Sequence, residues 1–166
     1  MMGRRIFYFL FFIFSGLGFS QTSEEGGSLS ELQKKYSDDH AVYLSEKEHV
    51  VINTKGNDFE IYSDVNWEIL YLSDKGRAYG DQNIQFSEFS EIQNIKAFSY
   101  IPKNGDTEKL KKTKVTEFKT EDVYDGSYFF HDNKQIAFRF PGSESGTKIN
   151  LAYREVIKKP QFLGST

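Results

Sequence analysis

Residues 59–71 alternate between apolar and polar side chains more clearly than any other part of the chain. The apolar side chains occupy odd positions, interrupted only by Ser63: Phe59, Ile61, Val65, Trp67, Ile69 and Tyr71. The even positions carry Glu60, Tyr62, Asp64, Asn66 and Glu68. Successive side chains of a strand point to opposite faces. This pattern therefore predicts a long antiparallel strand with one face buried.

Further segments predict strands joined by turns. Residues 41–53 are the expected partner of this strand across a loop at 54–58, and residues 92–101 are expected to pair with 108–119. Between the latter two, Asn104-Gly105 is the favoured pair where φ must be positive. Residues 138–153 predict a hairpin whose turn is set by Pro141-Gly142 and Gly146. About seven strands with regular turns predict an antiparallel sandwich.

The N-terminal side of this region predicts little regular structure. Residues 21–30 are polar and rich in Gly and Ser, which is typical of a flexible leader. Ser30 is expected to cap a short helix over residues 31–36. The predicted fold is therefore all-β, an antiparallel β-sandwich with a short N-terminal helix.

The first twenty residues have the pattern of a signal peptide. Arg4 and Arg5 precede the apolar run 6–14, and Gly18-Phe19-Ser20 offers small residues for cleavage before Gln21. The alternative is an uncleaved anchor, but the run is short against the roughly twenty residues that span a bilayer. We therefore expect an exported protein, periplasmic or extracellular, with no membrane span after cleavage.

Composition excludes several classes of function. The chain has no cysteine, hence no disulfide, thiol nucleophile or cysteine-ligated metal. Its formal net charge is −3, which argues against nucleic acid as a partner. The local exception is the cluster Lys109, Lys111, Lys112 and Lys114, which is typical of the solvent face of an edge strand. Phosphate or lipid binding is the alternative for this cluster.

No group of residues forms a catalytic or metal-binding pattern. His40, His49 and His131 are scattered, and neighbouring acids such as Asp38-Asp39 do not define a cleft. A nucleophile elbow at 142–146 would need Ser in the middle, where the chain has Glu144. We therefore expect no enzyme activity, no cofactor and no metal.

Tyrosines outside the expected core offer a candidate interaction surface. These are Tyr62, Tyr79, Tyr124 and Tyr128. Aromatic side chains on a sandwich can bind a partner domain or a sugar. A role in covering a second sheet face is the structural alternative. For glycan binding, replacement of Trp67 or Tyr62 would be the test.

Three blocks of sequence occur in an order that resembles a known family. They are residues 39–44, the strand-turn-strand segment 95–116 and the segment 138–153. In the second block, Pro102-Lys103-Asn104-Gly105 replaces a Pro-Asp-Gly turn. In this order they resemble the DUF3857 domain, an exported module that precedes a transglutaminase-like domain in many bacterial proteins.

The resemblance implies a β-sandwich of no known activity, with catalytic Cys, His and Asp residues in a later domain. The expected organisation is a signal peptide at 1–20, a leader and helix at 21–38, the DUF3857-like domain at 39–160 and a tail at 161–166. The leading hypothesis is an exported, non-catalytic accessory or interaction module. Its expected partner is a transglutaminase-like domain or another envelope protein. The alternatives are a truncated fragment of a transglutaminase-like protease and a glycan-binding module.

Overall fold

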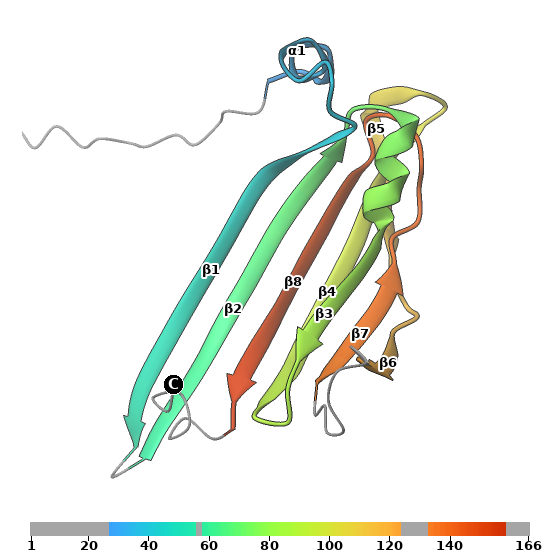
Figure 1. Ribbon diagram of the computed structural model, residues 1–166. Helices are drawn as coiled ribbons and strands as arrows, with labels where there is room; N and C mark the ends of the chain where they lie inside the picture. The colour runs from blue at the N-terminus through green and yellow to red at the C-terminus, as the bar shows by residue number, and fades with distance from the viewer. Residues whose placement is uncertain (1–26, 56–57, 124–132, 159–166) are drawn as a thin grey trace, which may run out of the picture.

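A computed structural model describes residues 27–55, 58–123 and 133–158 of the chain (Figure 1). These residues form one short α-helix, one 3-10 helix and eight strands in two antiparallel sheets. The elements are α1 (Leu29–Lys35), β1 (Ala41–Lys55), β2 (Asp58–Tyr71), η1 (Asp74–Gly80), β3 (Asp81–Phe86), β4 (Ser90–Lys103), β5 (Asp106–Lys114), β6 (Lys119–Asp122), β7 (Lys134–Arg139) and β8 (Lys148–Ile157). The prediction of an all-β antiparallel sandwich with a short N-terminal helix is confirmed.

The large sheet has the strand order β1-β2-β8-β4-β5, and the small sheet has the order β3-β7-β6. Two of the three expected hairpins are present. The register of β1 with β2 runs from Ala41 opposite Tyr71 to Lys55 opposite Asp58. β4 pairs with β5 across a turn in which Asn104 and Gly105 have φ of 53° and 77°. This turn has the positive φ values that its sequence predicts.

The predicted hairpin at 138–153 is wrong, because β7 and β8 belong to different sheets. The loop between them bonds to the end of β2. Gly146 N–H donates to the carbonyl of Tyr71 (2.8 Å), and Tyr71 N–H donates to the carbonyl of Thr147 (2.9 Å). These bonds place the beginning of β8 next to the end of β2. Alternation identified both strands, but it does not specify their partners.

The helix starts earlier than expected, because Ser28 and not Ser30 caps it. The N–H of Glu31 donates to Ser28 Oγ, and Ser28 N–H donates to the Glu31 carboxylate, which forms a capping box. The helix buries no residue. The Gln33 side-chain amide holds it to the sandwich by donating to the carbonyl of Leu72 (2.7 Å).

The core lies between the two sheets. The face of the large sheet that packs on the small sheet is called the inner face here, and the opposite one the outer face. The core cluster comprises Trp67, Ile69, Tyr71, Ile84, Ala97, Val115, Phe138, Phe140, Ile149 and Leu151. The alternation of β2 therefore gave the correct buried face at Trp67, Ile69 and Tyr71. It failed at Phe59, which is 57% exposed.

Tyr71 is fully buried, and its hydroxyl has no hydrogen-bond partner among the described residues. A buried polar group without a partner costs about 1–3 kcal/mol. We expect Tyr71→Phe to leave the free energy of unfolding unchanged or to raise it by up to about 1 kcal/mol. Urea unfolding checks this, and a loss of more than about 1 kcal/mol would show that the hydroxyl has a partner.

Because Tyr71 is buried, its ionisation lowers the stability of the folded protein at alkaline pH. Burial raises the pKa of this side chain to about 12, and the charge of Asp81 adds to the effect. The folded-state pKa lies above the unfolded value, so stability is complete below about pH 10. Stability is then lost as the pH rises toward about 12. In Tyr71→Phe, we expect a smaller loss over this interval in unfolding measured as a function of pH.

Candidate interaction surface

Tyr62 lies on the outer face of the large sheet, where its ring is covered. The guanidinium of Arg154 sits 4.0 Å from the centre of the Tyr62 ring. The same guanidinium makes two hydrogen bonds to the carboxylate of Asp64, of 2.7 and 2.8 Å. Tyr62 is half-buried as a result. The Tyr62 ring therefore stabilises the Arg154–Asp64 ion pair, whether or not it also contacts a partner.

The Arg154 hydrogen bond holds the pKa of the Asp64 carboxyl below its usual value, against a smaller opposing effect of burial. The stability that this pair contributes is present above the unfolded-state pKa and is lost as the pH falls through the folded-state value. In Arg154→Met, we expect the pKa of Asp64 to rise toward its ordinary value of about 3.9. NMR titration of the carboxyl carbon measures this; an unchanged pKa would contradict the assignment of Arg154 as the cause.

Of the other three tyrosines, the structure describes only Tyr79. Tyr79 is 44% exposed on η1, which follows the upper end of β2 in Figure 1. Tyr124 and Tyr128 lie outside the described residues. A shared surface of four tyrosines thus stays a prediction.

The lysine cluster lies on β5, which is an edge strand of the large sheet, as expected. Lys109 pairs with Asp106 at 3.0 Å, and the ammonium of Lys112 sits 4.0 Å from the centre of the Phe98 ring. All four lysines of the cluster are exposed. They leave this edge charged, which disfavours pairing with another strand.

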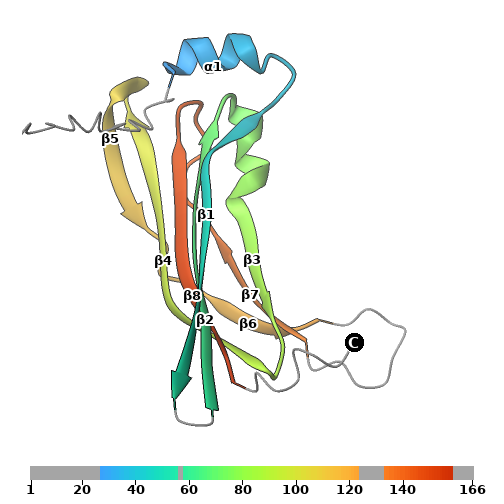
Figure 2. The same ribbon diagram turned by 90° about the vertical axis from the view of Figure 1, so that its left-hand side faces the viewer.

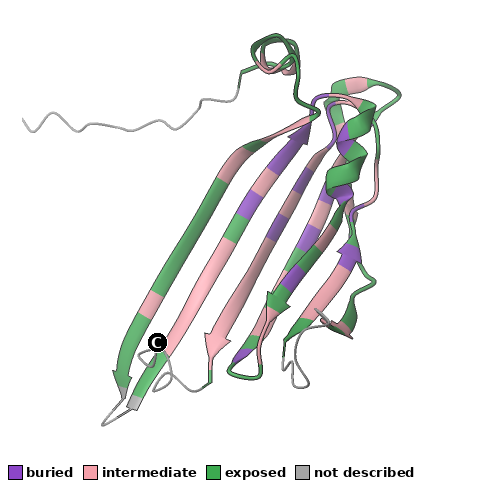
Figure 3. Cartoon of the chain, in the orientation of Figure 1, coloured by how far each residue is buried: buried purple, intermediate pink, exposed green. Residues whose placement is uncertain are grey.

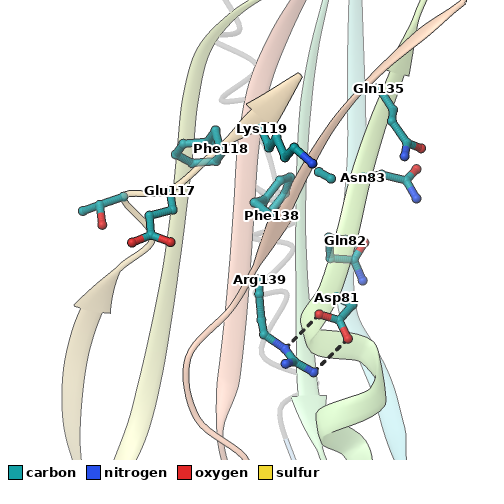
Figure 4. Close-up of a pocket in the computed structure, with 11 residues that line it drawn as sticks. Asp81, Gln82, Asn83, Glu117, Phe118, Lys119, Gln135, Phe138 and Arg139 are labelled. Carbon is teal, nitrogen blue, oxygen red and sulfur yellow. Dashed lines mark hydrogen bonds and ion pairs between the residues drawn. The ribbon is translucent and has the colours of Figure 1, made fainter. Parts of the chain in front are cut away.

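An open groove of about 660 Å³ runs along the small sheet (Figure 4). Asp81 and Arg139 form a two-bonded ion pair there (2.8 and 2.9 Å), and the rings of Phe118 and Phe138 pack at 5.2 Å. The lining residues are Asp81, Gln82, Asn83, Thr116, Glu117, Phe118, Lys119, Gln135, Ala137, Phe138 and Arg139. This lining contains no serine, cysteine or histidine, and the charges of Asp81 and Arg139 in it are paired with each other.

The histidines and the loop at 142–146 do not form a site in the described part of the chain. His40 Nδ1 lies 3.3 Å from Ser73 Oγ, His49 faces Asp64 in the register of β1 with β2, and His131 is outside the described residues. Ser145 Oγ donates to the carbonyl of Leu72 and has a structural role. The described residues contain no cluster of three metal-ligating side chains. They also contain no helix long and apolar enough to cross a bilayer.

The far end of the β1–β2 hairpin exposes apolar side chains on the inner face. Figure 3 shows that most of β1 toward this end is exposed. Val50, Ile52 and Phe59 are 55%, 63% and 57% exposed. The half-buried Ile61 and Ile157 lie beside them, because Ile61 is opposite both Ile52 and Ile157. These five residues are called the hairpin patch. They continue the inner face beyond the area that the small sheet covers.

A row of carboxylates separates the hairpin patch from the core on the same face. Glu46 is opposite Trp67, Glu48 is opposite Val65, and Glu155 is opposite Ser63. Among the described residues, no lysine or arginine forms a salt bridge with any of the three. Burial, followed by the charges of Glu155 and Glu48, raises the pKa of the nearby Tyr153. This part of the inner face is therefore both negative and apolar.

Sequence reasoning did not find the hairpin patch, although a signal was present. The triplet Val50-Val51-Ile52 is an apolar run in β1 just before the hairpin loop. Such a run suits a strand covered on both faces. Since β1 is an edge strand with exposed residues along most of its length, the run marks a surface that the described chain leaves open.

Comparison with solved structures shows the same fold in a larger protein. A crystal structure from Parabacteroides distasonis, described as a putative protease, matches with a TM-score of 0.58 and 15% sequence identity. The match covers 72% of this chain and 23% of the other, so this chain corresponds to about a quarter of that protein. A comparison with curated proteins gave no match.

A family model matches residues 64–166, which run from the middle of β2 to the last residue of the sequence. The matched family is described as a domain of unknown function with a solved structure. The match covers more than half of the chain and includes the second and third of the three sequence blocks, at 95–116 and 138–153. The chain therefore belongs to the DUF3857 family.

Proposed function

We propose that this protein is an exported, non-catalytic accessory module that binds another folded domain through the hairpin patch. The observation that carries the proposal is the exposure of Val50, Ile52 and Phe59 on the same sheet face that forms the core further along. Contiguous apolar patches on a protein surface commonly mark interaction sites. The leader at residues 1–20 supports the export component.

The energetics favour an occupied patch. Burying a large apolar side chain from water contributes about 1.5–3 kcal/mol. Ile52 and Phe59 are each more than half exposed, so a partner that covers them gains most of this amount from each. The acidic row beside the patch disfavours a second acidic surface and favours one that carries a positive charge.

Site-specific photocross-linking tests the proposal. The protein is produced in the organism that encodes it, with benzoylphenylalanine at Ile52 or, as a control, at Lys111 on the far edge strand. We expect a light-dependent adduct from position 52, identified by mass spectrometry, and none from position 111. Equal adducts from both positions, or none from 52, would rule out the patch as an interface.

The export component has its own measurement. Cell fractionation and N-terminal sequencing of the mature protein should find it outside the cytoplasm with Gln21 as its first residue. A cytoplasmic protein that begins at Met1 would contradict this component.

A second candidate function is a non-catalytic part of a protease, and the Parabacteroides likeness is the observation that favours it. An antibody against the sandwich domain tests this reading on extracts of the encoding organism. A much longer polypeptide whose peptides include a domain with Cys, His and Asp would support it. A single band of the length given by this sequence would count against it.

A further inference from the structure

The small sheet has a free edge beside the hairpin patch. β3 pairs with β7 only, and in the described residues no strand pairs with its other edge. Figure 1 shows β3 on the side of the small sheet that is nearer to β8 and β2. In Figure 2, which looks from the β1 side, the lower ends of β1 and β2 project beside this edge. A strand added to β3 would therefore lie over the uncovered inner face.

The hydrogen bond next to the start of β3 determines which of its backbone groups point away from β7. Phe140 N–H donates to the carbonyl of Gly80 (2.9 Å), one step before the register of Asp81 with Arg139. Hydrogen-bonded and non-hydrogen-bonded pairs alternate along an antiparallel ladder. The N–H and C=O groups of Asp81, Asn83 and Gln85 are therefore directed away from β7.

The hydrogen bonds at the other edge of the small sheet agree with this alternation of bonded and outward-directed residues. Val123 N–H donates to the carbonyl of Asn133 (2.9 Å), so odd-numbered residues of β7 bond to β6 and even-numbered ones bond to β3. The same alternation directs the N–H of Thr120 away from β7, at the edge opposite to β3. Asn83 and Thr120 are thus equivalent positions on two edges of one sheet.

We propose that the partner of this module adds an extended strand to the free edge of β3, so that the strand lies over the hairpin patch and lengthens the small sheet. This inference rests on the proposed function, since it specifies how the partner occupies the patch. Strand addition is a common mode of peptide recognition, in which main-chain bonds give affinity and alternate side chains give specificity. Here the free edge of β3, which can bond to the main chain of a strand, is adjacent to an apolar surface that can contact its inward side chains.

The chemistry of the inner face specifies the added strand. Inward positions over Ile52, Phe59 and Ile61 require branched or aromatic apolar side chains. An inward position near Glu48 and Glu155 requires a lysine or arginine, because these carboxylates have no basic partner in the described chain. Outward positions continue the polar surface of Asp81, Asn83 and Gln85, all of which are exposed. The occupant is therefore a strand that alternates apolar and polar residues and carries one inward basic residue.

Binding of synthetic peptides tests the proposal on the full chain. The probes are fluorescein-labelled decapeptides with Val or Ile at inward positions, Thr at outward positions and Lys at each inward position in turn. A second set carries Glu in place of Lys. We expect at least one Lys peptide to bind, and its Glu counterpart to bind about tenfold more weakly because of the acidic row.

Proline substitution separates strand addition from simple apolar contact. Asn83→Pro removes the N–H that an added strand needs but no bond to β7, and prolines are tolerated on edge strands at such positions. We expect it to weaken peptide binding about tenfold or more, while Thr120→Pro at the opposite edge changes it by less than about twofold. Equal binding by Asn83→Pro and the unaltered chain, or no binding by any peptide, would overturn the proposal.

Hydrogen exchange gives a readout that needs no substitution. In the free protein the amide protons of Asp81, Asn83 and Gln85 should exchange quickly, and saturation with peptide should protect them while Thr120 stays unprotected. A patch that binds a partner only through side chains would give the cross-link at position 52 without protection of these amides. That result would contradict strand addition but support the proposed function. The absence of a cross-link would contradict the proposed function itself.

Discussion

Replacement of Ile149 by Ala is expected to lower the free energy of unfolding by about 2–5 kcal/mol. Ile149 is fully buried in β8, where it lies between Ile69 of β2 and Ser99 of β4. Both neighbours are themselves fully inside the sandwich, so the cavity has little freedom to close. Urea unfolding measures the loss, and the fluorescence of Trp67 reports it because Trp67 is the chain's single tryptophan and belongs to the same core.

Ile52→Ala is the matched control, since it removes the same atoms from a side chain that is 63% exposed. We expect it to change the free energy of unfolding by no more than about 0.5 kcal/mol. A cost equal to that of Ile149→Ala would show that the hairpin patch is covered within the protein itself, and docking on it would then be excluded. A small cost at both positions would contradict the placement of the core.

Gly76→Ala is expected to cost about 3 kcal/mol, at the upper end of the range for overpacking. A Cβ on Gly76 would lie 2.7 Å from the carbonyl oxygen of His40 and 2.7 Å from Cβ of Tyr71. Neither atom belongs to the flexible end of a side chain. The His40 carbonyl also accepts the N–H of Leu72 (2.9 Å), so its displacement weakens the connection between the starts of β1 and η1. The midpoint of urea unfolding measures the effect.

Gly105→Ala provides the comparison for Gly76→Ala. Gly105 has φ of +77°, and nothing lies within 4 Å of the position that a Cβ would take. The substitution therefore carries only the backbone penalty of a left-handed residue, about 1 kcal/mol. If Gly105→Ala proved more costly than Gly76→Ala, packing around η1 would be looser than the structure shows.

The parts of the fold that the sequence predicted are those with local causes. β1 pairs with β2, and β4 with β5, because each pair is joined by a short turn between alternating segments. The pairing of β8 with β2 and β4 has no such local signal. It depends on hydrogen bonds between Tyr71 and the loop residues Gly146 and Thr147, which are distant in sequence. Similarly, Ser28 and Ser30 are two residues apart, and the reciprocal bonds of Ser28 with Glu31 make Ser28 the cap.

The candidate surface was less predictable, because alternation gives the face of a residue but not its cover. Tyr62 was placed correctly opposite the buried face, yet the guanidinium over its ring comes from Arg154, far along the chain. Phe59 was placed on the correct face and expected to be buried. It is exposed because the small sheet covers only part of the large sheet. How far the small sheet extends depends on the whole fold, and no local sequence pattern specifies it.

The position of β8 has a consequence for the order in which the protein folds. Among the described strands it is the last in sequence, yet it lies at the centre of the large sheet, between β2 and β4. A chain that emerges from the ribosome N-terminus first can form the β1–β2 and β4–β5 hairpins early, but these have nothing to join them until β8 arrives. Contacts that close such long loops slow folding. Completion of the large sheet must therefore wait until β8 has been synthesised, and the two hairpins stay unjoined until then.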